Sequence, residues 1–158
     1  MISFREIMEE DNPIIAYLIR YNLKNNGLDV PGTVYFDKEI DYLSKVYGKN
    51  GSKYYVAVDE TGKVVGGIGF AAYTNMVQTG EIQKLYLDDS VKGAGLSYKL
   101  IALIEDKMRE AGYKHAYIET HKNLKAAIHI YEKLGYKPIP RPAEVQHGTM
   151  THFYLKDL

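Results

Sequence analysis

A short glycine-containing turn is the part of this sequence whose residue types most clearly suggest chemistry. It reads Lys92-Gly93-Ala94-Gly95-Leu96-Ser97 and leads from an apolar run into an amphipathic segment. Free N–H groups at a helix start attract anions, and glycine lets the backbone approach a ligand closely. The turn therefore predicts a phosphate site to which Lys92 adds positive charge. A tight strand-to-helix turn that needs glycine only for its dihedral angles is an equal alternative on this segment alone.

Two standard phosphate-binding patterns can be tested against this turn. The P-loop pattern G-x-x-x-x-G-K-[ST] is absent from the sequence. The dinucleotide pattern G-x-G-x-x-G fails at its third glycine, because Gly93 and Gly95 are followed by Tyr98. A dinucleotide fold also needs a parallel β-α-β unit around the motif, whereas predicted hairpins precede it here. A dinucleotide-binding oxidoreductase is therefore disfavoured.

A second informative segment lies some thirty residues further on, where small side chains precede a tyrosine at helical spacing. Ala127 stands four residues before Tyr131, so a ligand can approach this face of the helix closely. The alternative is that Tyr131 is a core aromatic on one apolar stripe with Ile130 and Leu134. On this segment alone the core interpretation is the stronger.

The elements that must position these residues begin with a short strand, predicted from the alternating apolar residues at 2–4. A helix with Pro13 in its first turn follows. Apolar periodicity predicts helices over 13–27 and 37–48, followed by β-rich strands over 54–58, 63–73 and 81–87. Gaps this short favour antiparallel hairpins. The Gly66-Gly67-Ile68-Gly69 run within the second of these strands predicts a bulge or close packing rather than a phosphate site.

The second half of the chain alternates helix and strand. The pattern predicts a helix over 96–111, a strand over 113–120, a helix that contains Ala127 to Leu134 and is closed by Gly135, and a strand over 149–155. We expect one domain spanning 1–158, an α+β fold with a mixed, mostly antiparallel central sheet of about six to seven strands flanked by four helices. Its one parallel crossover runs from strand 81–87 through helix 96–111 to strand 114–119.

Taken together, the two segments resemble the GNAT superfamily of N-acyltransferases over nearly the whole chain. The turn at 92–97 is similar to that family's acyl-CoA pyrophosphate loop, [QR]-x-x-G-x-[GA]. Residues 127–136 are similar to its following motif, A-x-x-x-Y-x-x-x-G-[FY]. Lys92 stands where Arg or Gln is usual, which keeps the charge but not the guanidinium fork. Ser97 stands where Gly or Ala is usual.

The resemblance implies acetyl-CoA as co-substrate and a set of residues that bind it. The amides of residues 93–97 (Gly93, Ala94, Gly95, Leu96 and Ser97) would hold the pyrophosphate beside Lys92. The backbone edge of Leu85, Tyr86 and Leu87 would pair with the pantetheine arm, and the small side chain of Ala127 would leave room for it. Asn123 is a candidate pantetheine contact, although it stands eight residues before Tyr131 where the family usually has Asn at seven, and Leu124 fills that place.

The family's reaction is direct attack of an amine on the thioester, between two strands that splay apart. Tyr131 matches the general acid that protonates the departing thiolate, and Glu81 matches the base that some members use, often through water. An acceptor ammonium with a pKa near that of lysine, about 10.4, must lose a proton before it can attack. Each proton transfer of this kind contributes about 10²- to 10⁴-fold in rate.

Composition narrows the possible functions further. The chain has 158 residues, no Cys, and 20 Lys and Arg against 20 Asp and Glu. The absence of Cys excludes disulfides and a Cys nucleophile, and zero net charge argues against a nucleic-acid partner. The five His show no ligand spacing, so we expect no metal. No apolar run reads as a signal peptide or membrane span, so we expect a cytoplasmic protein without a membrane partner, a monomer or a homodimer.

The leading interpretation is therefore an acetyl-CoA-dependent N-acetyltransferase that acts on an amine of a small molecule or a peptide. The acceptor is not readable from the sequence, because acceptor sites are built from variable loops. The alternative from another class is a non-catalytic acyl-CoA-binding or sensor domain with the same fold. The presence of both Tyr131 and Glu81 favours the enzyme.

Overall fold

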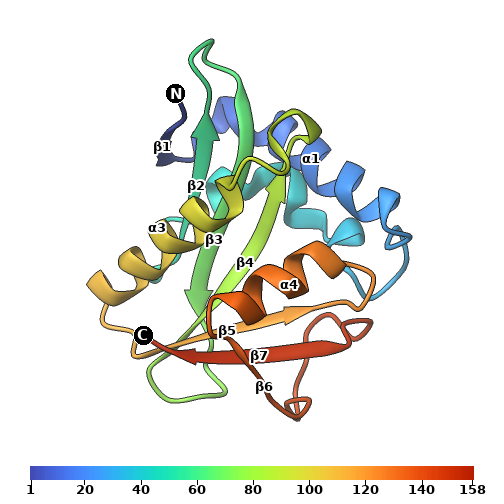
Figure 1. Cartoon of the computed structure of the whole chain (residues 1–158), viewed down its shortest axis with the longest axis vertical. Coiled ribbons are helices and arrows are strands. Elements are labelled where there is room, and N and C mark those ends of the chain that lie inside the picture. Colours follow the sequence, from blue (N-terminus) through green and yellow to red (C-terminus); the bar gives the residue numbers. More distant parts are fainter.

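The computed structural model describes all residues, 1–158, as a seven-stranded sheet with helices on both faces (Figure 1). The strand order is β1-β2-β3-β4-β5-β7-β6, and every neighbouring pair is antiparallel except β4 and β5. The strands are β1 (Ser3–Glu6), β2 (Lys53–Val58), β3 (Val64–Ala72), β4 (Thr79–Leu87), β5 (His115–Thr120), β6 (Lys137–Pro138) and β7 (His152–Asp157). The α-helices are α1 (Asn12–Asn25), α2 (Leu43–Val46), α3 (Leu96–Glu110) and α4 (Lys125–Lys133). The predicted α+β class, with one parallel pair and four helices, is confirmed.

Alternation along the central strands divides the core into two layers. Tyr55 and Ala57 of β2 pack with α3 and α4 on one face, while Tyr54 and Val56 pack with α1 and α2 on the other. All four side chains are buried. This alternation, with a period of two, is expected of a strand whose two faces are both covered. The shape of the site is then set by strands β4 and β5.

The helix predicted over 37–48 is wrong as a continuous element. Lys38–Tyr42 is a 3₁₀ helix, and only the four residues of α2 are α-helical. Ile40 and Leu43 are both fully buried, as the apolar pattern required. A spacing of three fits the three residues per turn of a 3₁₀ helix as well as it fits an α-helix, so the apolar pattern alone did not decide between them.

Other boundaries also differ from the prediction. Strand β4 begins at Thr79 and strand β7 at His152, and the two-residue β6 was not predicted. β6 lies at the sheet edge and contains Pro138, which has no N–H to donate to a further strand. No helix in the structure is both long and apolar enough to cross a lipid bilayer.

The parallel pair β4 and β5 separates after a short contact. Their residues pair only from Thr79 to Glu81 on β4 and from His115 to Tyr117 on β5. β5 stays paired with β7 as far as Thr120, while β4 stays paired with β3, so the two strands diverge beyond Glu81 (Figure 1). The divergence leaves a wedge in the middle of the sheet.

Candidate active site

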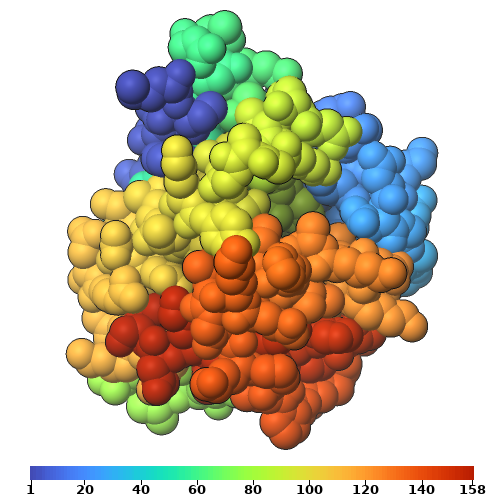
Figure 2. Space-filling view, viewed as in Figure 1, coloured from blue at the N-terminus to red at the C-terminus, as the bar shows by residue number.

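A cavity of about 570 Å³ occupies the wedge between β4 and β5. Its walls come from both strands, from α4, from the turn before α3 and from the loops that follow α1 and precede β7. The surface is hollowed between the turn around residues 88–97 and α4 (Figure 2). The two segments that the sequence singled out therefore border one cavity.

The glycine turn presents unused backbone donors at the start of α3. Gly93 and Gly95 have φ angles of +81° and +78°, a region that favours glycine, and no side chain caps the helix at Gly95. Five backbone amides in this turn and the first turn of α3 donate no hydrogen bond within the chain: those of Gly93, Gly95, Leu96, Ser97 and Tyr98. A cluster of free amides at a helix N-terminus is the arrangement that binds phosphate groups.

Lys92 is held beside this turn by side chains from two other elements. Its ammonium lies 2.7 Å from Oδ1 of Asn22 on α1 and 2.8 Å from a carboxylate oxygen of Asp89. Lys92, Gly93 and Ser97 line the cavity. The other residues of the turn do not line the cavity: Ala94 is exposed, and the Leu96 side chain is buried in the core.

Strand β4 offers its backbone along the same cavity. Leu85, Tyr86 and Leu87 line it beyond the last residue that pairs with β5. The Leu87 carbonyl accepts a hydrogen bond of 3.0 Å from the buried amide of Asn22, which ties α1 to this edge. The Tyr86 phenol also reaches the cavity, and burial raises its pKa.

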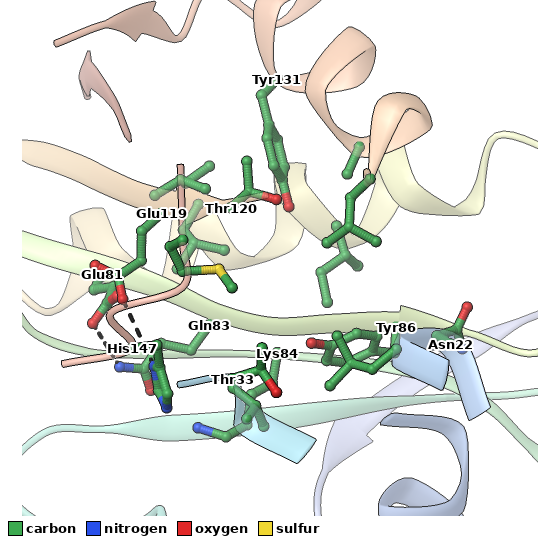
Figure 3. A pocket seen from close by; sticks show the side chains of 18 of the residues that line it. Asn22, Thr33, Glu81, Gln83, Lys84, Tyr86, Glu119, Thr120, Tyr131 and His147 are labelled. Carbon is green, nitrogen blue, oxygen red and sulfur yellow. Dashed lines mark hydrogen bonds and ion pairs between the residues drawn. The ribbon is translucent and has the colours of Figure 1, made fainter. Parts of the chain in front are cut away.

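Tyr131 on α4 serves both the core and the cavity. Its ring is 6% exposed and packs edge to face against Tyr136, as the core interpretation required. Its hydroxyl forms no hydrogen bond within the chain and points into the cavity (Figure 3). Burial raises the pKa of Tyr131, so the phenol holds its proton at neutral pH. Ala127, one turn earlier on α4, lines the same wall.

Glu81 lies at the vertex where β4 leaves β5, opposite Tyr117 in the register. Burial raises its pKa to about 7, and the nearby charge of Glu119 acts in the same direction. An amide hydrogen bond of 2.8 Å from Gln83 opposes this rise, as do the charges of Lys84 and His147. A carboxylate with a pKa near 7 is suited to accept a proton at neutral pH.

Several cavity residues were not among those predicted. Glu119 accepts a hydrogen bond of 2.9 Å from Tyr117, and His147 places its Nδ1 3.7 Å from Glu119 and its Nε2 2.8 Å from Asp37. Glu119, His147 and Glu81 gather at one end of the cavity (Figure 3). The contacts with Glu119 and Asp37 raise the pKa of His147 against the effect of its burial. The alternation of β5 is the only sequence signal that points to Glu119, and none points to His147.

Asn123 lies outside the cavity. Its amide nitrogen donates to the carbonyl of Asn26 at the end of α1, at 2.9 Å, and the side chain is exposed. The next residue, Leu124, lines the cavity instead. Asn123 therefore joins α1 to α4, and we leave it out of the binding site proposed below.

Comparison with known proteins agrees with this geometry. The sequence matches the acetyltransferase (GNAT) family over residues 8–136. It is 39% identical over 137 residues to the "uncharacterized N-acetyltransferase YjgM" of Escherichia coli K12, covering 85% of this chain and 81% of that protein. The chain thus belongs to the acetyltransferase (GNAT) family and is an acyltransferase.

Solved structures show the same fold. A GNAT-family acetyltransferase from Staphylococcus aureus superposes with a TM-score of 0.87 at 16% identity, covering 99% of both chains. The PaiA N-acetyltransferase of Thermoplasma acidophilum, solved in complex with coenzyme A, superposes with a TM-score of 0.76 at 16% identity over 100% of this chain and 99% of that chain. At these identities the likeness concerns the architecture alone.

Proposed function

We propose that this protein transfers the acetyl group of acetyl-CoA directly to a primary amine. The observation that supports this most strongly is the cluster of five free amides at the start of α3, where Gly93 and Ser97 line a cavity whose other groups include the free phenol of Tyr131 and the carboxylate of Glu81. An anion-binding turn, an acid and a base around one opening are the parts that acyl transfer from a coenzyme A thioester requires.

The turn before α3 holds the coenzyme's pyrophosphate in this proposal. Lys92 adds a positive charge whose position is fixed by Asn22, and the Ser97 hydroxyl lies on the same wall. The backbone of Leu85–Leu87 pairs with the pantetheine arm, which fills the gap that β5 leaves beside β4. Ala127 keeps the facing wall of α4 clear.

Glu81 prepares the acceptor. It takes a proton from the acceptor ammonium, directly or through water, and the freed nitrogen lone pair attacks the thioester carbonyl carbon. A pKa of about 7 makes the carboxylate available while keeping it basic enough to assist. The new C–N bond forms and the C–S bond breaks when the tetrahedral intermediate collapses.

Tyr131 completes the transfer by giving its proton to the departing thiolate sulfur. Its hydroxyl is free of other hydrogen bonds, and it carries its proton at neutral pH. The attacking nitrogen loses its second proton as the amide forms, and this proton passes through water to the phenolate, while the proton on Glu81 returns to water. One proton is therefore released overall as ammonium and thioester become amide and thiol. Atoms and charges balance without a covalent acyl-enzyme.

The direct test is thiol release from acetyl-CoA in the presence of a panel of amines, amino acids and peptides. We expect release that depends on the acceptor, with the acetylated amine detected by mass. Propionyl-CoA in parallel reports the acyl preference. Binding of acetyl-CoA without release against any acceptor would refute the proposal and favour the non-catalytic acyl-CoA-binding alternative.

A further inference from the structure

Strand β4 contains a bulge whose extra residue is Lys84. Gly67 of β3 pairs with Tyr86 and Gly69 pairs with Gln83, so Lys84 and Leu85 together face the single residue Ile68. Lys84 has a φ of +54°, a left-handed conformation that costs a non-glycine residue about 1 kcal/mol or more. Bulges of this kind redirect a side chain, and Lys84 lines the cavity.

The Lys84 ammonium has no carboxylate partner. Its hydrogen-bond partner is the neutral phenol of Tyr47 at 3.3 Å, and it also lies 5.5 Å from the centre of that ring. Lys92, the other lysine fixed at the cavity wall, is by contrast 2.8 Å from Asp89. Burial lowers the pKa of Lys84, and only the more distant charges of Asp37, Glu81 and Glu39 oppose this. The cavity thus contains the Lys84 ammonium, whose positive charge is not neutralised by a carboxylate in contact with it.

The carboxylates at this end of the cavity also differ in whether another group of the chain engages them. Glu119 is engaged by Tyr117 and His147, and Asp37 by His147. Glu39 is an exposed residue at the rim. Glu81 has only the Gln83 amide. One carboxylate and one ammonium inside the cavity therefore lack an oppositely charged partner in contact.

Glu81 and Lys84 lie three residues apart on β4, so their Cα atoms are at most about 10 Å apart. In Figure 3 Lys84 lies between the group formed by Glu81, Glu119 and His147 and the phenol of Tyr86. A small molecule with one ammonium and one carboxylate complements this pair. A polyamine instead would place a second positive charge near Lys84, which is unfavourable.

We infer that the acceptor is a small amino acid, whose amino group faces Glu81 while its carboxylate binds the Lys84 ammonium. The inference rests on the proposed acetyltransferase function and specifies its substrate class. A charge-assisted contact with a carboxylate is stronger than a neutral hydrogen bond, so the amide of the same amino acid should be a worse acceptor by about 10- to 100-fold in kcat/KM.

The experiment compares matched acceptors: each L-amino acid that is acetylated, its amide, its decarboxylated amine, and spermidine. It uses the parent chain, Lys84→Gln, Lys84→Arg and the exposed control Lys49→Gln. We expect the parent to prefer the carboxylate-bearing acceptor, Lys84→Gln to lose that preference, and Lys84→Arg to retain most of it. Unchanged acetyl-CoA affinity and thermal midpoint of Lys84→Gln would show that the bulge is intact.

Four results would overturn the inference. Equal kcat/KM for amino acid and amide, or better turnover of spermidine, would refute it while leaving the acetyltransferase function standing. So would a Lys84→Gln variant that loses activity equally toward acid and amide, because a purely structural lysine has that effect. Binding of acetyl-CoA with no turnover of any amine would refute the proposed function and the inference together.

Discussion

Replacement of Glu81 by Gln should make the protein more stable at alkaline pH while it removes the base. In the folded protein burial raises the pKa of Glu81 from 4.5 to about 7. Below pH 4.5 the group is protonated in both states and has no pH-dependent effect on stability. As pH rises from 4.5 to 7 the unfolded chain releases this proton and the folded chain retains it, so the free energy of unfolding falls; above 7 the loss is constant.

The size of the effect follows from the two pKa values. A rise from 4.5 to about 7 corresponds to about 3 kcal/mol of unfolding free energy at pH 8, which is an upper limit for a side chain that lines an open cavity. Gln does not ionise and can still accept the hydrogen bond from Gln83. Glu81→Gln should therefore match the parent at pH 4 and exceed it by about 1–3 kcal/mol at pH 8.

Urea unfolding of the parent and of Glu81→Gln between pH 4 and 8 measures this difference, with the exposed Glu144→Gln as control. In the same samples kcat at pH 8 should fall by about 10²- to 10⁴-fold, and the rise of the parent's kcat with pH around 7 should disappear. A stability difference that stays flat across this range would refute the assigned pKa. If the kcat of the variant still falls as the pH decreases around 7, as that of the parent does, Glu81 is not the base.

Three further substitutions test the rest of the site. Tyr131→Phe should lower kcat by about 10²- to 10⁴-fold without changing acetyl-CoA affinity, measured by calorimetry; unchanged turnover at saturation would exclude the phenol as acid. Lys92→Ala should weaken acetyl-CoA binding by about 1.5–3 kcal/mol and leave kcat at saturation nearly unchanged; equal affinity would remove it from the coenzyme site. Gly67→Ala should cost about 1–3 kcal/mol in urea unfolding, since its Cβ would lie 2.5 Å from the Tyr54 ring. Gly148→Ala, whose Cβ meets nothing within 4 Å, is the control and should change stability by less than about 0.5 kcal/mol; equal effects would contradict this packing.

The sequence was most informative where the chemistry depends on local structure. The turn around Gly93 and Gly95 and the helix that bears Tyr131 were both identified, because dihedral requirements and helical spacing act over a few residues. The Tyr131 ring belongs to the core and its hydroxyl reaches the cavity. The sequence offered these as alternatives because spacing does not distinguish the two ends of a side chain.

The residues that it did not identify depend on contacts between distant parts of the chain. His147 reaches Asp37 across 110 residues, and Thr149 joins the same loop to the carbonyls of Pro31 and Gly32. Lys84 enters the cavity only because the register between β3 and β4 slips by one residue. A side-chain period of two, read from sequence alone, contains no information about such a slip.

The bulge at Lys84 is itself maintained by packing on the neighbouring strands, which links the stability of the sheet to the site. The Tyr54 hydroxyl donates a hydrogen bond of 2.7 Å to the Lys84 carbonyl and helps to hold that residue in its left-handed conformation. The Tyr54 ring fits there because Gly67 and Gly69 have no side chain: a Cβ on either would come within 2.6 Å of it. The predicted close packing of this glycine run is thus observed, and it supports the bulge. Gly67→Ala should consequently perturb the site as well as stability: its KM for the acceptor should rise, and its affinity for acetyl-CoA should also fall, because Gly67 pairs with Tyr86 within the Leu85–Leu87 edge assigned to the pantetheine arm.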